Sequence, residues 1–472
     1  MSFPLVIQGG MGAGVSSWML AKSVSSYGQL GVVSGTALDV SLLRLLQLGD
    51  KEGHIRRALS HFPVPEIAER IINKYFIEGG KPEKEPFKTS SMFTINPGKA
   101  LLELNIVSNF VEVFLAKEGH NNPVGINYLE KIQMPNLSAI YGAMLAGVDY
   151  ILMGAGIPRE IPGVLDKLAK HEEVSYKINV TGATSEDDFK EVFNPVEILG
   201  KTLPGLKRPK FLAIIASAIL ALTLSRKATG KVDGFIIEGP SAGGHNAPPR
   251  GLMQLDDLGE PVYGEKDEVD IEKIKELGYP FWLAGSYGKP EKIEDAKKLG
   301  ATGVQVGTLF AFCVESGFSP EYKKAVIEKV IKDRATVFTD PVASPTGFPF
   351  KVVRLENTVS EEETYLARNR ICDLGYLRHI YRKEDGTLGY RCPAEPVDQY
   401  LKKGGKVEDT VNRKCLCNAL VSNIGLAQLQ SNGYVEKGLV TAGDEVNEIK
   451  KLLKPGKDTY TAADVLDYLL GK

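Results

Sequence analysis

The chain has few cysteines, no long apolar run and no leader-like start. Five cysteines among 472 residues are too few for a disulfide framework. The longest apolar stretch, residues 211–224, has about 14 residues, fewer than the roughly 18–20 that span a bilayer. The opening "MSFPLVIQGG" lacks a charged segment followed by an apolar one, so no signal peptide is expected. These absences predict a cytoplasmic protein that does not enter a membrane.

An excess of charge of one sign is also missing. The formal net charge is −2, from 57 basic and 59 acidic side chains. Such a balance provides neither the basic surface that nucleic acid attracts nor a polybasic membrane contact. The composition, 43% hydrophobic and 25% charged, is that of an ordinary globular protein. We therefore expect a small-molecule substrate, and the sequence leaves a homo-oligomer open.

Eight short apolar runs recur along the first three quarters of the chain. They are continuous rather than alternating, which is typical of strands buried on both faces of a parallel sheet. Helical patterns separate them, so the sequence predicts an α/β fold, a closed (β/α)8 barrel of the TIM type. An open doubly wound sheet is the alternative. The eight runs are residues 4–10, 31–36, 123–129, 149–156, 210–217, 232–239, 280–286 and 303–310.

Two insertions and a tail extend this barrel. Residues 37–121 follow the second strand with about three amphipathic helical stretches, which could cover the barrel mouth or form an oligomer interface. A second insertion covers about 176–208. After residue 355 the strand–helix alternation stops, and the sequence becomes polar, aromatic and rich in turns. We therefore predict a barrel domain at 1–355 and a C-terminal appendage at 356–472.

The second insertion leaves the fifth strand ambiguous. Residues 176–182 also have the composition of a strand and compete with 210–217 for that position. We favour 210–217, because a helix and then the run 232–239 follow it at normal spacing.

The carboxyl ends of barrel strands build the active site in this fold. The first end, "IQGGMGAG", has so little side-chain bulk that a flat ring could lie against its backbone. Gln8 and Asn127 would offer amide groups to the ring edge, which suits a flavin. The residues expected beside a cofactor at these strand ends are Gln8, Gly9, Gly10, Met11, Gly35, Asn127, Gly154, Gly243 and Gly244.

The last two strand ends, "AGSYGKPEKI" and "VQVGTLF", are glycine-bearing loops that enter helical segments. Glycine lets backbone N–H groups approach a phosphate, and a helix N-terminus adds partial positive charge. Ordinary strand–helix turns are the alternative interpretation. We predict a phosphate site formed by Gly285, Ser286, Gly288, Gly307 and Thr308.

His245 stands in "EGPSAGGHNAPPRG", a loop short of side chains at the end of the sixth strand. An imidazole there could take or give a proton near neutral pH, so His245 is the candidate catalytic residue. The alternative is a histidine that only packs in the loop. The other five histidines lie in helical or polar contexts.

Four of the five cysteines fall in the last quarter of the chain. Four thiols are enough for a tetrahedral zinc ion or an iron–sulfur cluster. The spacing is not that of a common zinc ribbon, so four unlinked buried thiols are the alternative. The candidate metal ligands are Cys372, Cys392, Cys415 and Cys417.

These stretches together resemble the nitronate monooxygenase family, which includes flavin-dependent enoyl-acyl-carrier-protein reductases and some quinone reductases. The resemblance covers most of residues 4–355. The motifs that carry it are "IQGGMGAGVSS", "PVGINYL", "EGPSAGGHNAP", "AGSYGKPEKIEDAKKLGATGVQVGTLF" and "SPTGFPFKVVR". The family's acidic residue before AGGH is replaced here by Pro240 and Ser241, and Asn246 stands where arginine is common.

The resemblance implies FMN as cofactor, with Gln305 near the flavin and His245 over its reactive face. It implies an oxidoreductase, first of all a nitronate monooxygenase that converts alkyl nitronates to a carbonyl compound and nitrite. An enoyl-thioester or quinone reductase that uses NAD(P)H is the second interpretation. The third is a non-catalytic flavin-binding subunit of a fatty-acid or polyketide assembly. The departures from the family motif at Pro240, Ser241 and Asn246 leave the identity of the substrate undecided, but they do not affect the expectation of FMN.

Overall fold

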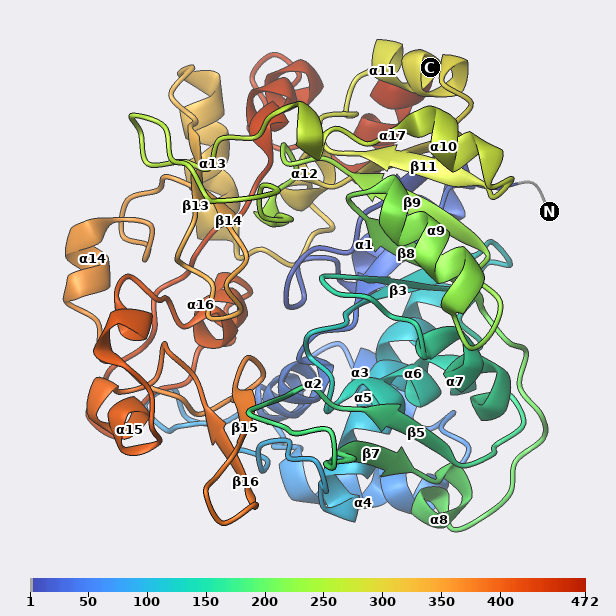
Figure 1. Cartoon of the computed structure of the whole chain (residues 1–472), viewed down its shortest axis with the longest axis vertical. Helices are drawn as coiled ribbons and strands as arrows, with labels where there is room; N and C mark the ends of the chain where they lie inside the picture. Colours follow the sequence, from blue (N-terminus) through green and yellow to red (C-terminus); the bar gives the residue numbers. More distant parts are fainter. Residues whose placement is uncertain (1–2) are drawn as a thin grey trace.

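Eight parallel strands form a closed barrel in the computed structural model, which describes residues 3–472. The sheet order is β1-β12-β11-β9-β8-β4-β3-β2. A parallel bridge from Ile7 to Leu30 joins the two end strands, with the Gln8 N–H donating to the Leu30 carbonyl at 2.9 Å. The predicted (β/α)8 barrel is therefore confirmed (Figure 1). Its strands are β1 (Val6–Gln8), β2 (Gly31–Ser34), β3 (Val124–Leu129), β4 (Tyr150–Gly154), β8 (Lys210–Ile215), β9 (Gly234–Glu238), β11 (Phe281–Ala284) and β12 (Gly303–Val306).

The fifth barrel strand is β8, as the spacing favoured. Its residues pair with β4 and β9, and helix α9 (Ala218–Lys227) follows with Ser217 as its cap, the Ser217 hydroxyl accepting from the Leu220 N–H. The competing segment, residues 176–182, instead contains the short strand β6 (Val180–Thr181) and the end of β5 (Val174–Lys177), which pairs antiparallel with β7 (Lys190–Phe193) outside the barrel. The alternating burial along both strands explains this: one face is covered and the other faces solvent.

Helices cover the outside of the barrel, and a compact apolar layer fills its inside. Trp282 is fully buried in this layer, and its indole N–H donates to the Pro4 carbonyl at 2.8 Å. A filled interior leaves the strand ends as the place for a ligand. The barrel helices are α1 (Trp18–Ser26), α5 (Lys99–Lys117), α6 (Asn136–Leu145), α7 (Ile161–Leu168), α9 (Ala218–Lys227), α10 (Ile271–Glu276), α11 (Pro290–Lys298), α12 (Thr308–Ala311) and α13 (Pro320–Ile331).

The first insertion contains four helices rather than about three. Helix α5 packs between α1 and α6, so it serves as the barrel helix before β3. Its side chains are buried around most of its circumference, as expected for a helix enclosed by others. The other three pack beside it: α2 (Leu38–Gln47), α3 (His54–Leu59) and α4 (Pro65–Tyr75).

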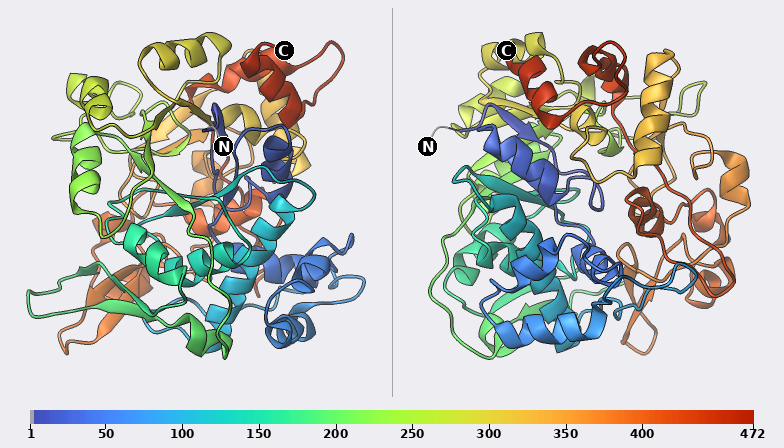
Figure 2. Two further views of the ribbon diagram at one scale, coloured as in Figure 1. Left: turned by 90° about the vertical axis from the view of Figure 1, so that its right-hand side faces the viewer. Right: turned by 180° about the vertical axis from the view of Figure 1, so that it is seen from behind.

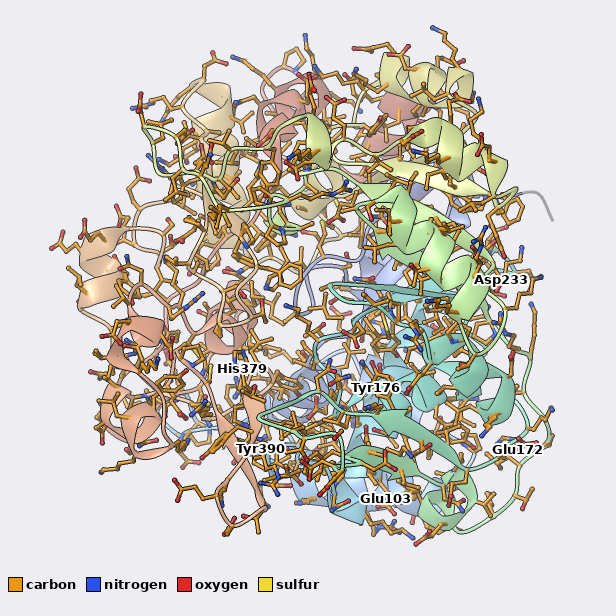
Figure 3. The ribbon with its side chains drawn as sticks, in the orientation of Figure 1. Glu103, Glu172, Tyr176, Asp233, His379 and Tyr390 are labelled. Carbon is orange, nitrogen blue, oxygen red and sulfur yellow. The ribbon has the colours of Figure 1, made fainter. Side chains whose placement is uncertain are left out.

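The second insertion meets the tail. Strand β6 (Val180–Thr181) pairs in parallel with β15 (His379–Arg382), which forms a hairpin with β16 (Leu388–Arg391). Tyr390 of β16, labelled in Figure 3, accepts a hydrogen bond from the Ile95 N–H at 3.0 Å. The tail therefore contacts both insertions of the barrel.

The tail forms one side of the molecule, in orange and red, and its last helix returns to the barrel beside α11 and α1 (Figures 1 and 2). A small sheet of the barrel segment lies next to the tail: β10 (Gly244–His245) and β13 (Val337–Asp340) flank β14 (Phe350–Val353). The Val353 N–H in turn donates to the Val440 carbonyl at 2.8 Å. The tail helices are α14 (Glu362–Leu366), α15 (Val397–Lys402), α16 (Leu416–Asn423) and α17 (Ala462–Leu470). Within residues 3–472, no helix combines the length and apolar character that crossing a bilayer requires.

Candidate active site

A large cavity of about 460 Å³ lies at the carboxyl ends of the barrel strands. The barrel loops supply most of its wall, and the tail supplies the rest. Thirteen of the sixteen residues predicted to bind the cofactor or act in catalysis line it, which brings together segments almost 300 residues apart. These are Gly9, Gly10, Met11, Asn127, Gly154, Gly243, Gly244, His245, Gly285, Ser286, Gln305, Gly307 and Thr308.

The loop after β1 gives the cavity a wall of bare backbone. A Cβ on Gly10 would lie 2.4 Å from the Asn127 Cβ, so no larger residue fits there. The amide oxygens of Asn127 and Gln305 are buried and accept no hydrogen bond from any residue among 3–472. Unpartnered buried acceptors are costly, so both oxygens call for an N–H donor from a ligand. A flavin ring edge suits such an amide pair, because its single N–H donates to one amide oxygen and its carbonyl oxygens accept from amide N–H groups.

The loop after β11 adopts the left-handed backbone that exposes N–H groups. Gly285 has φ +88° and Ser286 has φ +58°. Within residues 3–472, the N–H groups of Ser286 and Thr308 donate to no acceptor. Free N–H groups from two neighbouring loops are the donor set that binds a phosphate. The residues present therefore fit both ends of an FMN molecule.

Gly288 is placed differently from the other predicted phosphate contacts. Its N–H donates to the Glu445 carboxylate at 2.8 Å, so that donor is already used. Burial raises the pKa of Glu445, with the neighbouring Glu448 and Asp444 adding to the shift. The Thr308 hydroxyl accepts from the Gly443 N–H at 2.8 Å. Segment 443–445 of the tail thus lies directly beside the proposed phosphate site.

Two further predicted cofactor contacts lie behind the cavity wall. The Gln8 side chain is fully buried, accepts from the Val32 N–H at 3.0 Å and contacts the Ser16 hydroxyl at 2.8 Å. It connects the strands that close the barrel. Gly35 packs against the Tyr128 ring, where a Cβ would approach to 2.3 Å. These residues support the wall rather than line it.

His245 lies at the cavity with its backbone held in β10, where it pairs with Phe350. Its Nε2 is 2.7 Å from the Ser344 hydroxyl, and its ring meets the Phe350 ring edge-on at 4.7 Å between centroids. Burial, and secondarily the Lys131 charge, lower the pKa of His245 to about 4. The imidazole is therefore neutral at physiological pH.

Lys131 accounts for part of that shift. Its ammonium lies 3.5 Å from the centre of the Phe348 ring and donates to the Thr346 carbonyl at 3.2 Å. Burial lowers the pKa of Lys131 to about 8, and Glu130 partly opposes this. A mostly cationic side chain near His245 favours an anionic substrate.

Sequence reasoning missed Glu238, the last residue of β9, which lines the cavity. Burial raises the pKa of its carboxyl to about 7. A carboxyl that titrates near neutral pH in a cavity is a candidate proton donor or acceptor. The signal in the sequence was weak, because Glu238 follows the apolar run "GFII" as other polar residues follow other strands.

The contribution of the tail to the cavity was also missed. No periodicity in residues 356–472 marks the positions that reach the barrel. The tail residues that line the cavity are Tyr376, Leu377, Leu416, Cys417, Leu420, Thr441, Ala442 and Glu445.

The four candidate metal ligands gather around a second, small cavity of about 10 Å³. Two of them are fully or nearly buried, and two are half-buried. Among residues 3–472, no three His, Cys, Asp or Glu side chains form a ready-made ion site.

A comparison with known protein families finds a match for the part of the barrel that contains His245. The nitronate monooxygenase family model matches residues 207–384. The resemblance seen in the motifs is therefore confirmed over this segment, which includes β8 to β12 and both loops predicted to bind a phosphate. The match to this family supports a flavin-dependent oxidoreductase and, with it, FMN. None of the curated proteins compared with the chain matches it.

The solved structures that match this chain share little sequence with it. FabK from Thermotoga maritima is 16% identical, with a TM-score of 0.47 over 99% of this chain and 92% of its own. Nitroalkane oxidase from Streptomyces ansochromogenes is 14% identical, with a TM-score of 0.42 over 99% and 95%. The enoyl reductase domain of MlnA from Bacillus amyloliquefaciens is 11% identical, with a TM-score of 0.47 over 100% and 94%. Likeness at this level does not bear on function.

Proposed function

We propose that the chain is an FMN-dependent nitronate monooxygenase, which converts alkyl nitronates to a carbonyl compound and nitrite. One observation carries the proposal: a neutral His245 shares a cavity with two unpartnered amide oxygens and two free backbone N–H groups. The family match over residues 207–384 supports it.

The cofactor would be held mainly by backbone. The N–H groups of Ser286 and Thr308 would bind the phosphate, and the amides of Asn127 and Gln305 would bind the ring edge. Gly9 and Gly10 would lie against the ring, because side chains there would fill its space. When bound, the flavin would supply the oxidation–reduction chemistry that no side chain of this cavity provides.

His245 would orient the substrate rather than remove a proton from it. An imidazole with a pKa of about 4 is a weak base toward a neutral nitroalkane. A nitronate is already ionised, so it needs a hydrogen-bond donor and a positive field. His245, with Ser344 fixing its Nε2 at 2.7 Å, and the nearby Lys131 provide these.

Anaerobic mixing experiments test the assignment. A nitronate should bleach the bound flavin rapidly, and His245→Ala should slow this by about 10²–10³-fold without loss of flavin. His61→Ala is the matched control, because His61 is exposed and stacks on Phe114 away from the cavity. Rapid bleaching by NAD(P)H, with none by nitronate, would contradict the proposal.

An enoyl-thioester or quinone reductase is the second candidate, and two observations favour it. The tail wall of the cavity is largely apolar, which suits an acyl chain or a quinone ring. Glu238, with a pKa of about 7, could protonate a reduced substrate. This candidate predicts that NAD(P)H reduces the flavin, and that Glu238→Gln slows reoxidation by an enoyl thioester or quinone.

A further inference from the structure

The four late cysteines come from three separate segments of the tail. Cys372 lies in the loop before β15, and Cys392 follows the last residue of β16. Cys415 caps α16, and Cys417 lies in its first turn. All four line one cavity of about 10 Å³, so residues up to 45 positions apart converge on a single point.

A hydrogen-bond donor points at one of the four sulfurs. The Asn418 side-chain amide donates to the Cys415 sulfur at 3.4 Å. A neutral thiol is a weak acceptor, whereas a thiolate is a strong one. Hydrogen bonds of this kind accompany metal-bound thiolates and tune them.

The charges around the cluster also favour an anionic group. Arg370 donates to the carbonyl of Pro393, the residue after Cys392, at 2.6 Å, and its buried Nε donates to no acceptor within residues 3–472. The neighbouring charges are already paired: Arg368 with Glu436 at 3.1 Å, and Lys403 with Glu395 at 2.6 Å. Arg370 therefore supplies the positive charge that a four-thiolate metal centre, negative overall, would require.

We propose that Cys372, Cys392, Cys415 and Cys417 bind a thiophilic metal centre, either a zinc ion or an iron–sulfur cluster. The sulfurs converge without forming a ready-made ion site, so binding would draw them together around the metal. Cys313 takes no part, because it is buried in the barrel.

The position of the centre connects it to the active site. Leu377, Leu416 and Cys417 line both the small cavity and the large one, so they form a shared wall. A metal at the four sulfurs would fix α16 and, with it, the tail side of the substrate cavity. It would do so whichever substrate the enzyme uses.

Metal analysis of the full-length protein, purified without oxygen, tests the proposal. We expect either one zinc per chain, or iron with a matching amount of acid-labile sulfide and absorption near 400 nm. Cys392→Ser and Cys415→Ser should lose most of the metal, whereas Cys313→Ala should keep it. Metal at far below one equivalent in folded wild-type protein would overturn the proposal, as would full retention by both serine variants.

A thiol titration covers variants that fail to fold. In the native wild-type protein, a chelator should make four thiols reactive that were protected before. Unchanged reactivity after chelator would contradict a metal centre. The readouts are metal and thiols, so they do not depend on flavin content or turnover, and the two proposals can fail separately.

Discussion

The barrel and the tail build the same cavity by opposite means. The barrel contributes backbone: glycine loops, free N–H groups and two amide side chains at strand ends. The tail contributes bulk, with Leu377, Leu416 and Leu420 on its side of the cavity. Backbone groups suit a cofactor with a fixed shape, and apolar side chains suit a substrate that varies. We infer that the barrel determines the cofactor and the tail determines the substrate.

The two regions also differ in how they are held. Barrel strands pair with neighbours through a regular parallel ladder. The tail has short elements, and its buried side chains pack onto the barrel through Val440, Leu466 and their neighbours. Its stability therefore depends on long-range contacts more than on its own secondary structure.

Removal of the tail should have the largest effect. A chain that ends at residue 355 would lose the Val353–Val440 hydrogen bond and the cover of α17 over α1 and α11. The exposed apolar surface should make the fragment aggregate, which solubility and circular dichroism measure. A soluble fragment that still binds FMN would show that the barrel is independent of the tail.

Gly285→Ala should weaken FMN binding about tenfold, at a cost of about 1–2 kcal/mol for a left-handed L-residue. The new Cβ would also lie 3.0 Å from the Ser241 hydroxyl. Fluorescence titration with FMN measures the affinity. Gly278→Ala is the matched control, since φ is +72° there and no atom lies within 4 Å of its Cβ position. Equal losses in both variants would refute the assignment of this loop to the phosphate.

The turnover rate should fall on the acid side only as the pH approaches 4, rather than near pH 6.5. His245 has a pKa of about 4 in the folded chain, below its ordinary 6.5, so its neutral form persists until the pH approaches 4. The unfolded chain binds more protons in this window, so this group's contribution to the free energy of unfolding falls as pH drops from 6.5 to 4. His245→Asn should remove that dependence in denaturant titrations at several pH values. A fall in rate near pH 6.5 would place His245 in a more polar setting.

Leu420→Ala should have the smallest effect. The side chain lines the cavity from α16 and lies near Gly12, whose Cβ position is 3.5 Å from Leu420 Cδ1. Its loss should raise the KM of a bulky substrate by a few-fold and leave FMN affinity unchanged. Leu401→Ala, at an exposed site on α15, should change neither. Reduced FMN affinity in Leu420→Ala would contradict the inference that the barrel binds the cofactor and the tail binds the substrate.

The local sequence was sufficient to predict the repeating strand–helix units of the barrel. The strand runs, the choice of 210–217 as fifth strand and the glycine loops could be predicted, because a buried parallel strand requires a continuous apolar run. Glu238 was missed because one carboxylate after "GFII" differs little from any other strand end. The placement of Gln8, Gly35 and Gly288 depended on neighbours that no local pattern encodes, namely Val32, Tyr128 and Glu445.

The sequence by itself determined the barrel, the order of its strands and the bare backbone at their ends, since these follow from hydrophobic runs and from glycine. Only the tertiary structure decided which tail residues close the cavity, which donors are still free and how far His245 shifts in pKa. The physical reason is distance along the chain. Burial and electrostatic shifts arise from groups such as Lys131 and His245, which are 114 positions apart in sequence and meet only after folding.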